Sequence, residues 1–143
     1  MKHYLGIDLG SKTLGLSLSE SGIIAQSLET LRFKENDYQA AAVMISEVIK
    51  KHHIKTVVLG LPKHMNNDIG IRGKISETFK TQIEAIDSSV EIVLWDERLS
   101  TKTALKTMIQ GSERRKSQKQ KKDELAAVVI LQNYLDYKGA SLC

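Results

Sequence analysis

The sequence contains a single cysteine and a single proline among 143 residues, and each scarcity excludes a class of protein. The lone Cys143 rules out an intrachain disulfide and a cysteine zinc cluster, which favours a reducing, cytoplasmic location. One proline leaves no room for a polyproline arm. The longest apolar runs, residues 40–45 and 126–131, are far shorter than the ~18 residues that indicate a membrane span. We therefore expect no membrane anchor, and no signal peptide either.

Negative charge is scarce in one segment of the chain. The formal net charge of +4 is uneven, because residues 98–122 hold nine bases and one acid while the remainder holds twelve bases and sixteen acids. Such a basic segment on an otherwise acidic chain is typical of a surface that faces phosphates, although a solvated loop has the same composition. Aromatic residues make up only 5% of the chain, and none interrupts the segment. Their absence there argues against a base-stacking platform within it.

The order of the expected secondary structure predicts an α/β fold. Alternating or fully apolar runs predict strands over residues 3–9, 13–19, 22–33, 55–61 and 90–95. Helical spacing predicts helices from Asn36 or Asp37 to about 52, over 71–87, from Ser100 or Thr101 to about 110, and over 123–137, with a basic loop at 111–122. Right-handed crossovers then give a five-stranded mixed sheet, an antiparallel three-strand meander plus two parallel strands, with helices on both faces. The length predicts one domain, residues 1–143.

Along the predicted strands and helices, carboxylates occupy three positions where the secondary structure does not require an acid. Asp8 lies within an apolar strand, unless that strand stops at Ile7 and Asp8 opens the turn. Asp96 and Glu97 follow the strand 90–95, where either a capping role or a ligand-binding role is possible. Asp123 begins the last helix on its apolar side, where the helix dipole also favours an acid, whereas Glu124 has the position of an ordinary surface charge.

All three places belong to the carboxyl edge of the predicted sheet, so the carboxylates are expected to converge. Close carboxylates repel one another unless a cation neutralises them, and Mg²⁺ or Mn²⁺ prefers oxygen ligands. Two such ions about 4 Å apart activate water and stabilise the leaving oxygen in phosphodiester hydrolysis. The residues therefore predict a metal site beside a phosphate-facing basic segment.

Four ordered motifs resemble those of one known family. They are GIDLGSKT at residues 6–13, GLP at 60–62 with Met65 and Asn66, DERLST at 96–101, and KDELAAVVIL at 122–131. Together they resemble the YqgF family, also called RuvX, of Holliday junction resolvase-like proteins in the RNase H-like superfamily. The resemblance covers essentially the whole chain.

The resemblance implies a cytoplasmic, metal-dependent nuclease tied to 5′-end maturation of pre-16S rRNA, with Mg²⁺ or Mn²⁺ held by Asp8, Glu97 and Asp123. It favours Glu97 over Asp96. The partner expected is structured nucleic acid, either pre-rRNA or branched DNA, bound by a monomer or weak homodimer and without a membrane. The bases expected to contact this partner are Lys12, Arg98, Arg114, Arg115, Lys116, Lys119, Lys121 and Lys122.

Two alternatives to an rRNA nuclease remain at this point. One is a Holliday junction resolvase acting on branched DNA, and the other is a non-catalytic nucleic-acid-binding module. The first motif is also similar to the phosphate-binding hairpin of actin-like ATPases and sugar kinases, but those enzymes bind nucleotide between two such domains. The presence of all three acids favours catalysis.

Overall fold

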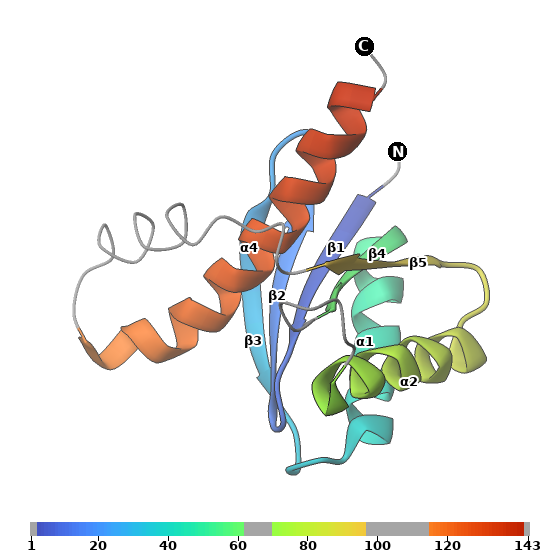
Figure 1. The fold of residues 1–143 in the computed structure, drawn as a ribbon, viewed down its shortest axis with the longest axis vertical. Helices are drawn as coiled ribbons and strands as arrows, with labels where there is room; N and C mark the ends of the chain where they lie inside the picture. Colours follow the sequence, from blue (N-terminus) through green and yellow to red (C-terminus); the bar gives the residue numbers. More distant parts are fainter. Residues whose placement is uncertain (1–2, 62–69, 97–114, 142–143) are drawn as a thin grey trace.

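The computed structural model describes residues 3–61, 70–96 and 115–141, without the side chains of 71–72, 115–123 and 140–141. Its elements follow one another along the chain as in Figure 1. They are β1 (His3–Leu9), β2 (Thr13–Ser19), β3 (Gln26–Arg32), α1 (Tyr38–His52), β4 (Ile54–Leu61), α2 (Ile71–Ile86), β5 (Glu91–Asp96) and α4 (Arg115–Ser141). No helix in these ranges is long and apolar enough to cross a membrane.

The strands form one five-stranded sheet in the order β3-β2-β1-β4-β5. β1 pairs antiparallel with β2, and β2 pairs antiparallel with β3. β4 runs parallel to β1, and β5 runs parallel to β4. This arrangement confirms the predicted meander with two added parallel strands. The carboxyl ends of β1, β4 and β5 consequently meet at one edge of the sheet.

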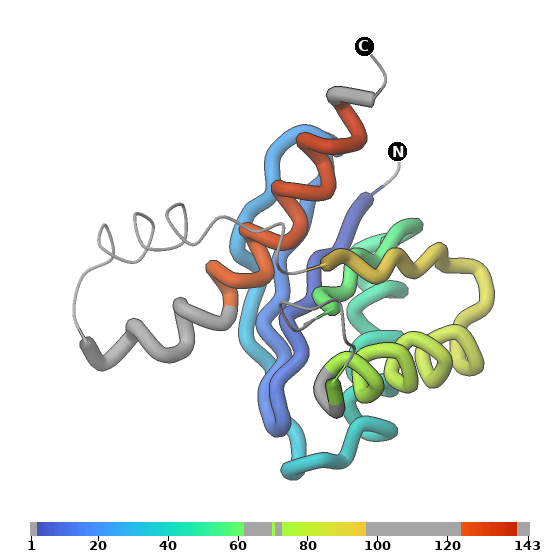
Figure 2. Tube along the Cα trace, viewed as in Figure 1, coloured from blue at the N-terminus to red at the C-terminus, as the bar shows by residue number. Residues whose placement is uncertain are grey.

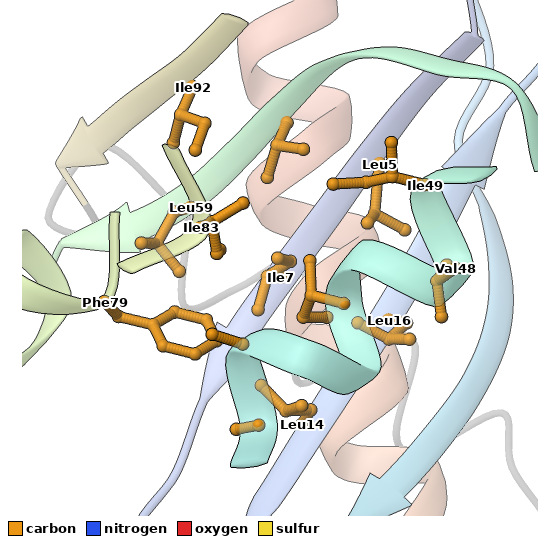
Figure 3. Packing of buried hydrophobic residues seen from close by; sticks show 14 of the residues in the cluster. Leu5, Ile7, Leu14, Leu16, Val48, Ile49, Leu59, Phe79, Ile83 and Ile92 are labelled. Carbon is orange, nitrogen blue, oxygen red and sulfur yellow. The ribbon is translucent and has the colours of Figure 1, made fainter. Parts of the chain in front are cut away.

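Two hydrophobic clusters divide the molecule into three layers. The larger cluster joins α1 and α2 to one face of the sheet through Leu5, Ile7, Leu59, Phe79 and others. Figure 3 shows these side chains between the sheet and the α1 and α2 helices, with α4 behind the sheet. The smaller cluster joins α4 to the opposite face through Tyr4, Val58 and Leu131. Strand alternation explains the division, because neighbouring residues of a strand point to opposite faces.

The ends of α1 agree with the sequence signals. The Asp37 side chain accepts a hydrogen bond from the Ala40 amide at 3.2 Å, so Asp37 caps the helix rather than Asn36. Lys50, Lys51 and His52 occupy its last turn, where the helix dipole favours cations.

The predicted start was wrong by four residues or more for two elements. The last helix begins at Arg115, so residues 115–122 are helical instead of forming a basic loop. Lysine, arginine and glutamine are good helix formers, and this stretch has no glycine or proline to stop a helix. The third strand begins at Gln26 and not at residue 22. Gly22 has a φ of 77°. The Ser19 and Ser21 hydroxyls accept hydrogen bonds from the amides of residues 22–24, so these residues form a turn.

Candidate functional site

Asp8 lies in β1 near the carboxyl edge of the sheet. It is paired opposite Gly15 of β2, so the strand does not stop at Ile7. Ile7 is level with Leu59 of β4, and Leu59 is level with Leu94 of β5. Asp8 therefore stands one residue beyond this row. Its side chain is half-buried.

Asp8 belongs to the face of the sheet that α4 covers. It has the same parity along β1 as Gly6 and Tyr4, and both of these contact α4. Leu5 and Ile7, at the alternate positions, pack in the α1 and α2 cluster. Because the side-chain period of a strand is two, the Asp8 carboxylate is directed to the α4 side.

Asp96 belongs to the opposite face. It shares the parity of Ile92 and Leu94, which pack in the α1 and α2 cluster, whereas Trp95 packs against α4. The structure thus places Asp8 and Asp96 at the same edge without bringing them together. Glu97, the other acid of this pair, lies outside the described residues.

The α4 helix crosses the sheet obliquely, as the tube in Figure 2 shows. In the first half of the helix, Glu124 accepts a hydrogen bond from the Thr30 hydroxyl of β3 at 3.0 Å. One turn on, the Ala127 carbonyl accepts one from the buried Ser17 hydroxyl of β2 at 2.7 Å. The second half of the helix lies over β1 and reaches β5 at Trp95.

Glycine at position 6 allows this close crossing. A Cβ atom built there would lie 2.8 Å from the Leu131 Cβ and 2.9 Å from the Ala127 carbonyl oxygen, closer than atoms can pack. The Ser17 hydroxyl would be nearer still. The helix can therefore approach β1 only because residue 6 has no side chain.

The crossing determines where residue 123 comes relative to Asp8. Ala127 lies over Gly6, and towards the other end of the helix Tyr134 packs against Tyr4. Decreasing numbers on α4 thus correspond to increasing numbers on β1. Four residues of helix rise about 6 Å and two residues of strand about 6.6 Å. Asp123, four residues before Ala127, is therefore on the part of the helix that approaches the Asp8 end of β1. The Asp123 side chain is outside the described part.

The predicted nucleic-acid contacts are placed only in part. Lys12 is exposed in the turn between β1 and β2, where the Gly10 amide donates to the Thr13 carbonyl at 2.8 Å and the Phe33 amide to the Lys12 carbonyl at 3.0 Å. This turn follows the carboxyl end of β1, beside Asp8. The predicted bases at 115–122 belong to the first turns of α4, and their side chains are not described. Arg98 and Arg114 lie outside the described residues.

The metal site itself is not assembled by described side chains alone. Among them, no three histidine, cysteine or acidic groups are grouped so that they could hold an ion. Asp8 is the one predicted ligand whose side chain is described. An apolar pocket of about 250 Å³ lies between α1 and α2, on the face away from Asp8, and is lined by Tyr38 and Lys74 among others.

Sequence reasoning missed several residues that position the site. Glu124, interpreted as surface charge, accepts a hydrogen bond from Thr30 and thereby links the first half of α4 to β3. No local pattern signals this contact, because the two residues are 94 positions apart. Gly6 and Ser17 were detectable only as small residues in otherwise apolar strands. At the far end of α4, the Lys138 ammonium donates to the Tyr4 hydroxyl at 2.8 Å, and this hydrogen bond raises the Lys138 pKa.

Comparisons with known proteins assign the chain to a family. The model of the RuvX family, described as Holliday junction resolvase, matches residues 2–137. The chain belongs to the RuvX family. A "Putative pre-16S rRNA nuclease" of Onion yellows phytoplasma is 51% identical over 93% of this chain and 88% of that protein. One of Staphylococcus aureus strain JH9 is 47% identical over 92% and 94%.

The fold is shared with a solved structure of low sequence identity. RuvC of T. thermophilus in complex with Holliday junction substrate superposes with a TM-score of 0.70 over 99% of this chain and 97% of that one, at 14% identity. This likeness confirms the RNase H-like fold expected for a RuvX member.

Proposed function

We propose that this RuvX member is a metal-dependent nuclease that hydrolyses phosphodiester bonds at the 5′ end of pre-16S rRNA. Asp8, Glu97 and Asp123 are its proposed metal-binding acids. The observation that carries the proposal is the close crossing of α4 over Gly6, because it brings the helix backbone at residue 123 towards the Asp8 end of β1. Family membership and relatives named as pre-16S rRNA nucleases support the substrate.

The donors fit a hard divalent cation. Carboxylate oxygens are the ligands that Mg²⁺ and Mn²⁺ prefer, and Asp8 offers one from a half-buried position at a sheet edge. Strand parity supports Glu97 over Asp96 as a second ligand, because Asp96 belongs to the other face. One or two bound cations supply activation of water and stabilisation of the leaving oxygen.

The chain's own residues orient the substrate for this hydrolysis. Water adds across the P–O3′ bond, which leaves a 5′-phosphate and a 3′-hydroxyl. Lys12, exposed in the turn after β1, is placed to hold a phosphate beside Asp8. The basic first turns of α4 and the bases Arg98 and Arg114 supply the remaining positive charge for the backbone.

The decisive assay compares cleavage by the wild type, Asp8→Asn and Asp96→Asn. The substrates are a labelled RNA carrying the 5′ end of pre-16S rRNA and a four-way DNA junction, each with Mg²⁺, Mn²⁺ or EDTA. We expect Asp8→Asn to lower RNA cleavage by more than about 100-fold, since even groups that only support a metal ligand contribute 10–100-fold. Asp96→Asn is the matched control. It makes the same substitution at the same edge of the sheet, but the Asp96 side chain belongs to the other face.

Each other outcome contradicts a specific part of the proposal. Cleavage that survives both EDTA and Asp8→Asn refutes the metal mechanism. Cleavage of the DNA junction alone supports the resolvase alternative. Metal-independent binding without any cleavage supports the binding module.

The basic start of α4 is tested through the salt dependence of binding. Replacing Lys116, Lys119 and Lys121 together by alanine should flatten the plot of log affinity against log salt by about one unit for each phosphate that is no longer neutralised. An equal loss of charge elsewhere provides the control. Lys50, Lys51 and Lys55 are exposed around the end of α1 and the start of β4, and their replacement should leave the slope unchanged.

A further inference from the structure

Aromatic side chains that are distant in the sequence meet where α4 passes the end of β5. The Trp95 and Tyr134 rings pack edge to face with centroids 5.6 Å apart, and the Trp95 and Tyr137 rings lie 5.4 Å apart at 55°. We call Trp95, Tyr134 and Tyr137 the aromatic cluster. Tyr4 of β1 adds a fourth ring, 6.4 Å from Tyr134. The sequence has seven aromatic residues, so this is a marked concentration of a scarce type.

The aromatic cluster is not fully buried, and one of its polar groups has no hydrogen-bond partner among the described residues. Tyr137 is 63% exposed although its ring contacts Trp95. Trp95 is half-buried, and its indole Nε1–H is shielded from water with no acceptor among the described residues. A buried donor without a partner is costly, and exposed aromatic surface has to be explained by something it contacts.

The cluster lies on the same face of the sheet as Asp8, and its Trp95 stands at the same level as Asp8. Trp95 is paired with Gly60 of β4, and Gly60 follows Leu59, the partner of Ile7. Asp8 and Trp95 are therefore one residue past the same row, with β4 between them. Two strand spacings amount to about 10 Å. Both residues have the parity that faces α4.

This placement suits a base of the nucleic acid strand whose phosphate lies at Asp8. A phosphate at Asp8 puts the attached nucleoside within reach of a neighbouring surface on the same face of the sheet. Stacking on aromatic rings is available only to bases that are not already stacked within a duplex. Positive charge next to the rings complements the backbone, because the Lys138 ammonium lies 2.8 Å from the Tyr4 hydroxyl and 5.0 Å from the centre of that ring.

We propose that the aromatic cluster stacks an unpaired base of the strand whose phosphate lies at Asp8, so that the enzyme selects strands that are single at the cleavage point. This inference rests on the proposed function and specifies its substrate. Tyr137 supplies the accessible ring, and Trp95, which itself packs against Tyr134, holds that ring in place. The basic segment, which has no aromatic residues, then contributes charge, while the specificity for unpaired bases comes from a different element.

The test uses the single tryptophan of the chain as its probe. The full-length protein is titrated in EDTA, which prevents metal-dependent cleavage, with a 12-nucleotide single-stranded RNA and with the same sequence as a duplex. We expect the single strand to change Trp95 fluorescence and the duplex to leave it unchanged. Tyr137→Ala should weaken single-strand binding by about 5- to 150-fold, which corresponds to 1–3 kcal/mol for one stacked base. Duplex binding should not change.

Two variants separate stacking from a structural effect. Tyr137→Phe keeps the ring and should bind as the wild type does. Ile24→Ala removes an apolar side chain of similar exposure, 61%, from the turn between β2 and β3 and should have no effect. Wild-type binding by Tyr137→Ala, or an equal loss for single strand and duplex, overturns the inference. A change of oligomeric state in Tyr137→Ala also overturns it, because the exposed ring would then serve a second copy.

The outcome is independent of the nuclease assay. Loss of single-strand binding in Tyr137→Ala together with full activity of Asp8→Asn would retain the stacking surface and refute the metal site. The reverse pair of results would retain the nuclease and refute the stacking surface.

Discussion

Replacing Gly6 by alanine tests the close crossing of α4 on which the site geometry depends. The added methyl group would lie 2.8 Å from the Leu131 Cβ and 2.9 Å from the Ala127 carbonyl oxygen, whereas ordinary contacts begin near 3.4 Å. Both atoms are fixed to the helix, so α4 has to move away from β1 by about 0.5 Å. Rotation of a side chain cannot relieve this contact.

The cost follows from two unfavourable terms and one favourable term. Overpacking of a core typically costs about 1–3 kcal/mol. Moving the helix also stretches the hydrogen bond from the Ser17 hydroxyl to the Ala127 carbonyl, which contributes about 1 kcal/mol. The lower entropy of the unfolded alanine chain returns about 0.5–1 kcal/mol. We expect a net loss of about 2–3 kcal/mol, or about 6–10 °C in Tm for a chain of this size.

Gly139→Ala is the matched control within the same protein. Gly139 also lies in a regular element, α4, but nothing lies within 4 Å of the position of its added methyl. Alanine favours a helix over glycine by up to about 1 kcal/mol, so this variant should be slightly more stable than the wild type. The same chemical change therefore has opposite signs at the two positions.

Urea and thermal denaturation followed by circular dichroism measure both effects. Gly6→Ala should also lose more RNA cleavage than its folded fraction explains, because a displacement of the helix moves residue 123 relative to Asp8. Ser17→Ala in the Gly6→Ala background should restore only part of the stability, since Leu131 and Ala127 still obstruct the methyl group. A Gly6→Ala protein as stable as the wild type would refute the close crossing.

Three further predictions concern single contacts. Ser17→Ala should cost about 1 kcal/mol because its hydrogen bond is removed, and Ser17→Val more because it adds volume under α4, as denaturation would show. Gln132→Ala should accelerate amide hydrogen exchange at Ala25, because the Gln132 side chain accepts a hydrogen bond from that amide at 2.8 Å. Ser89→Ala should raise the pKa of Asp87, which the Ser89 hydroxyl and amide hold below its usual value, as carboxyl NMR titration would show. Because that pKa is depressed in the folded protein, the stabilisation exists above the unfolded pKa and is lost as the pH falls through the folded value.

The sequence was sufficient for the architecture because its periodic signals are local. Apolar alternation places β1 and β2, a capping acid starts α1, and the handedness of crossovers orders the parallel strands. The start of α4 was predicted wrongly because a run of bases was interpreted as a basic loop. Charge pattern and helix propensity disagree over residues 115–122, and in the structure propensity prevails.

The contacts between distant residues were not predictable in the same way. Thr30 meets Glu124, and Trp95 meets Tyr137, only after the sheet and α4 have come together. Nothing in either partner's neighbourhood signals the other. The sequence therefore indicated which acids to consider, while the path of α4 determined which residues support them.

The alternation of side chains along β5 explains how this short strand contributes residues to both faces of the sheet. Ile92 and Leu94 fill the core beneath α1 and α2, which fixes the even positions of β5 on that side. Trp95 consequently faces α4, where the aromatic cluster forms, and Asp96 is directed away from Asp8. The residue pattern left the choice between the adjacent acids open, because both follow the same apolar run, and only the family resemblance favoured Glu97. The metal site that we propose takes its acid from the face of Trp95, and the packing of Ile92 and Leu94 in the α1 and α2 cluster therefore argues against Asp96.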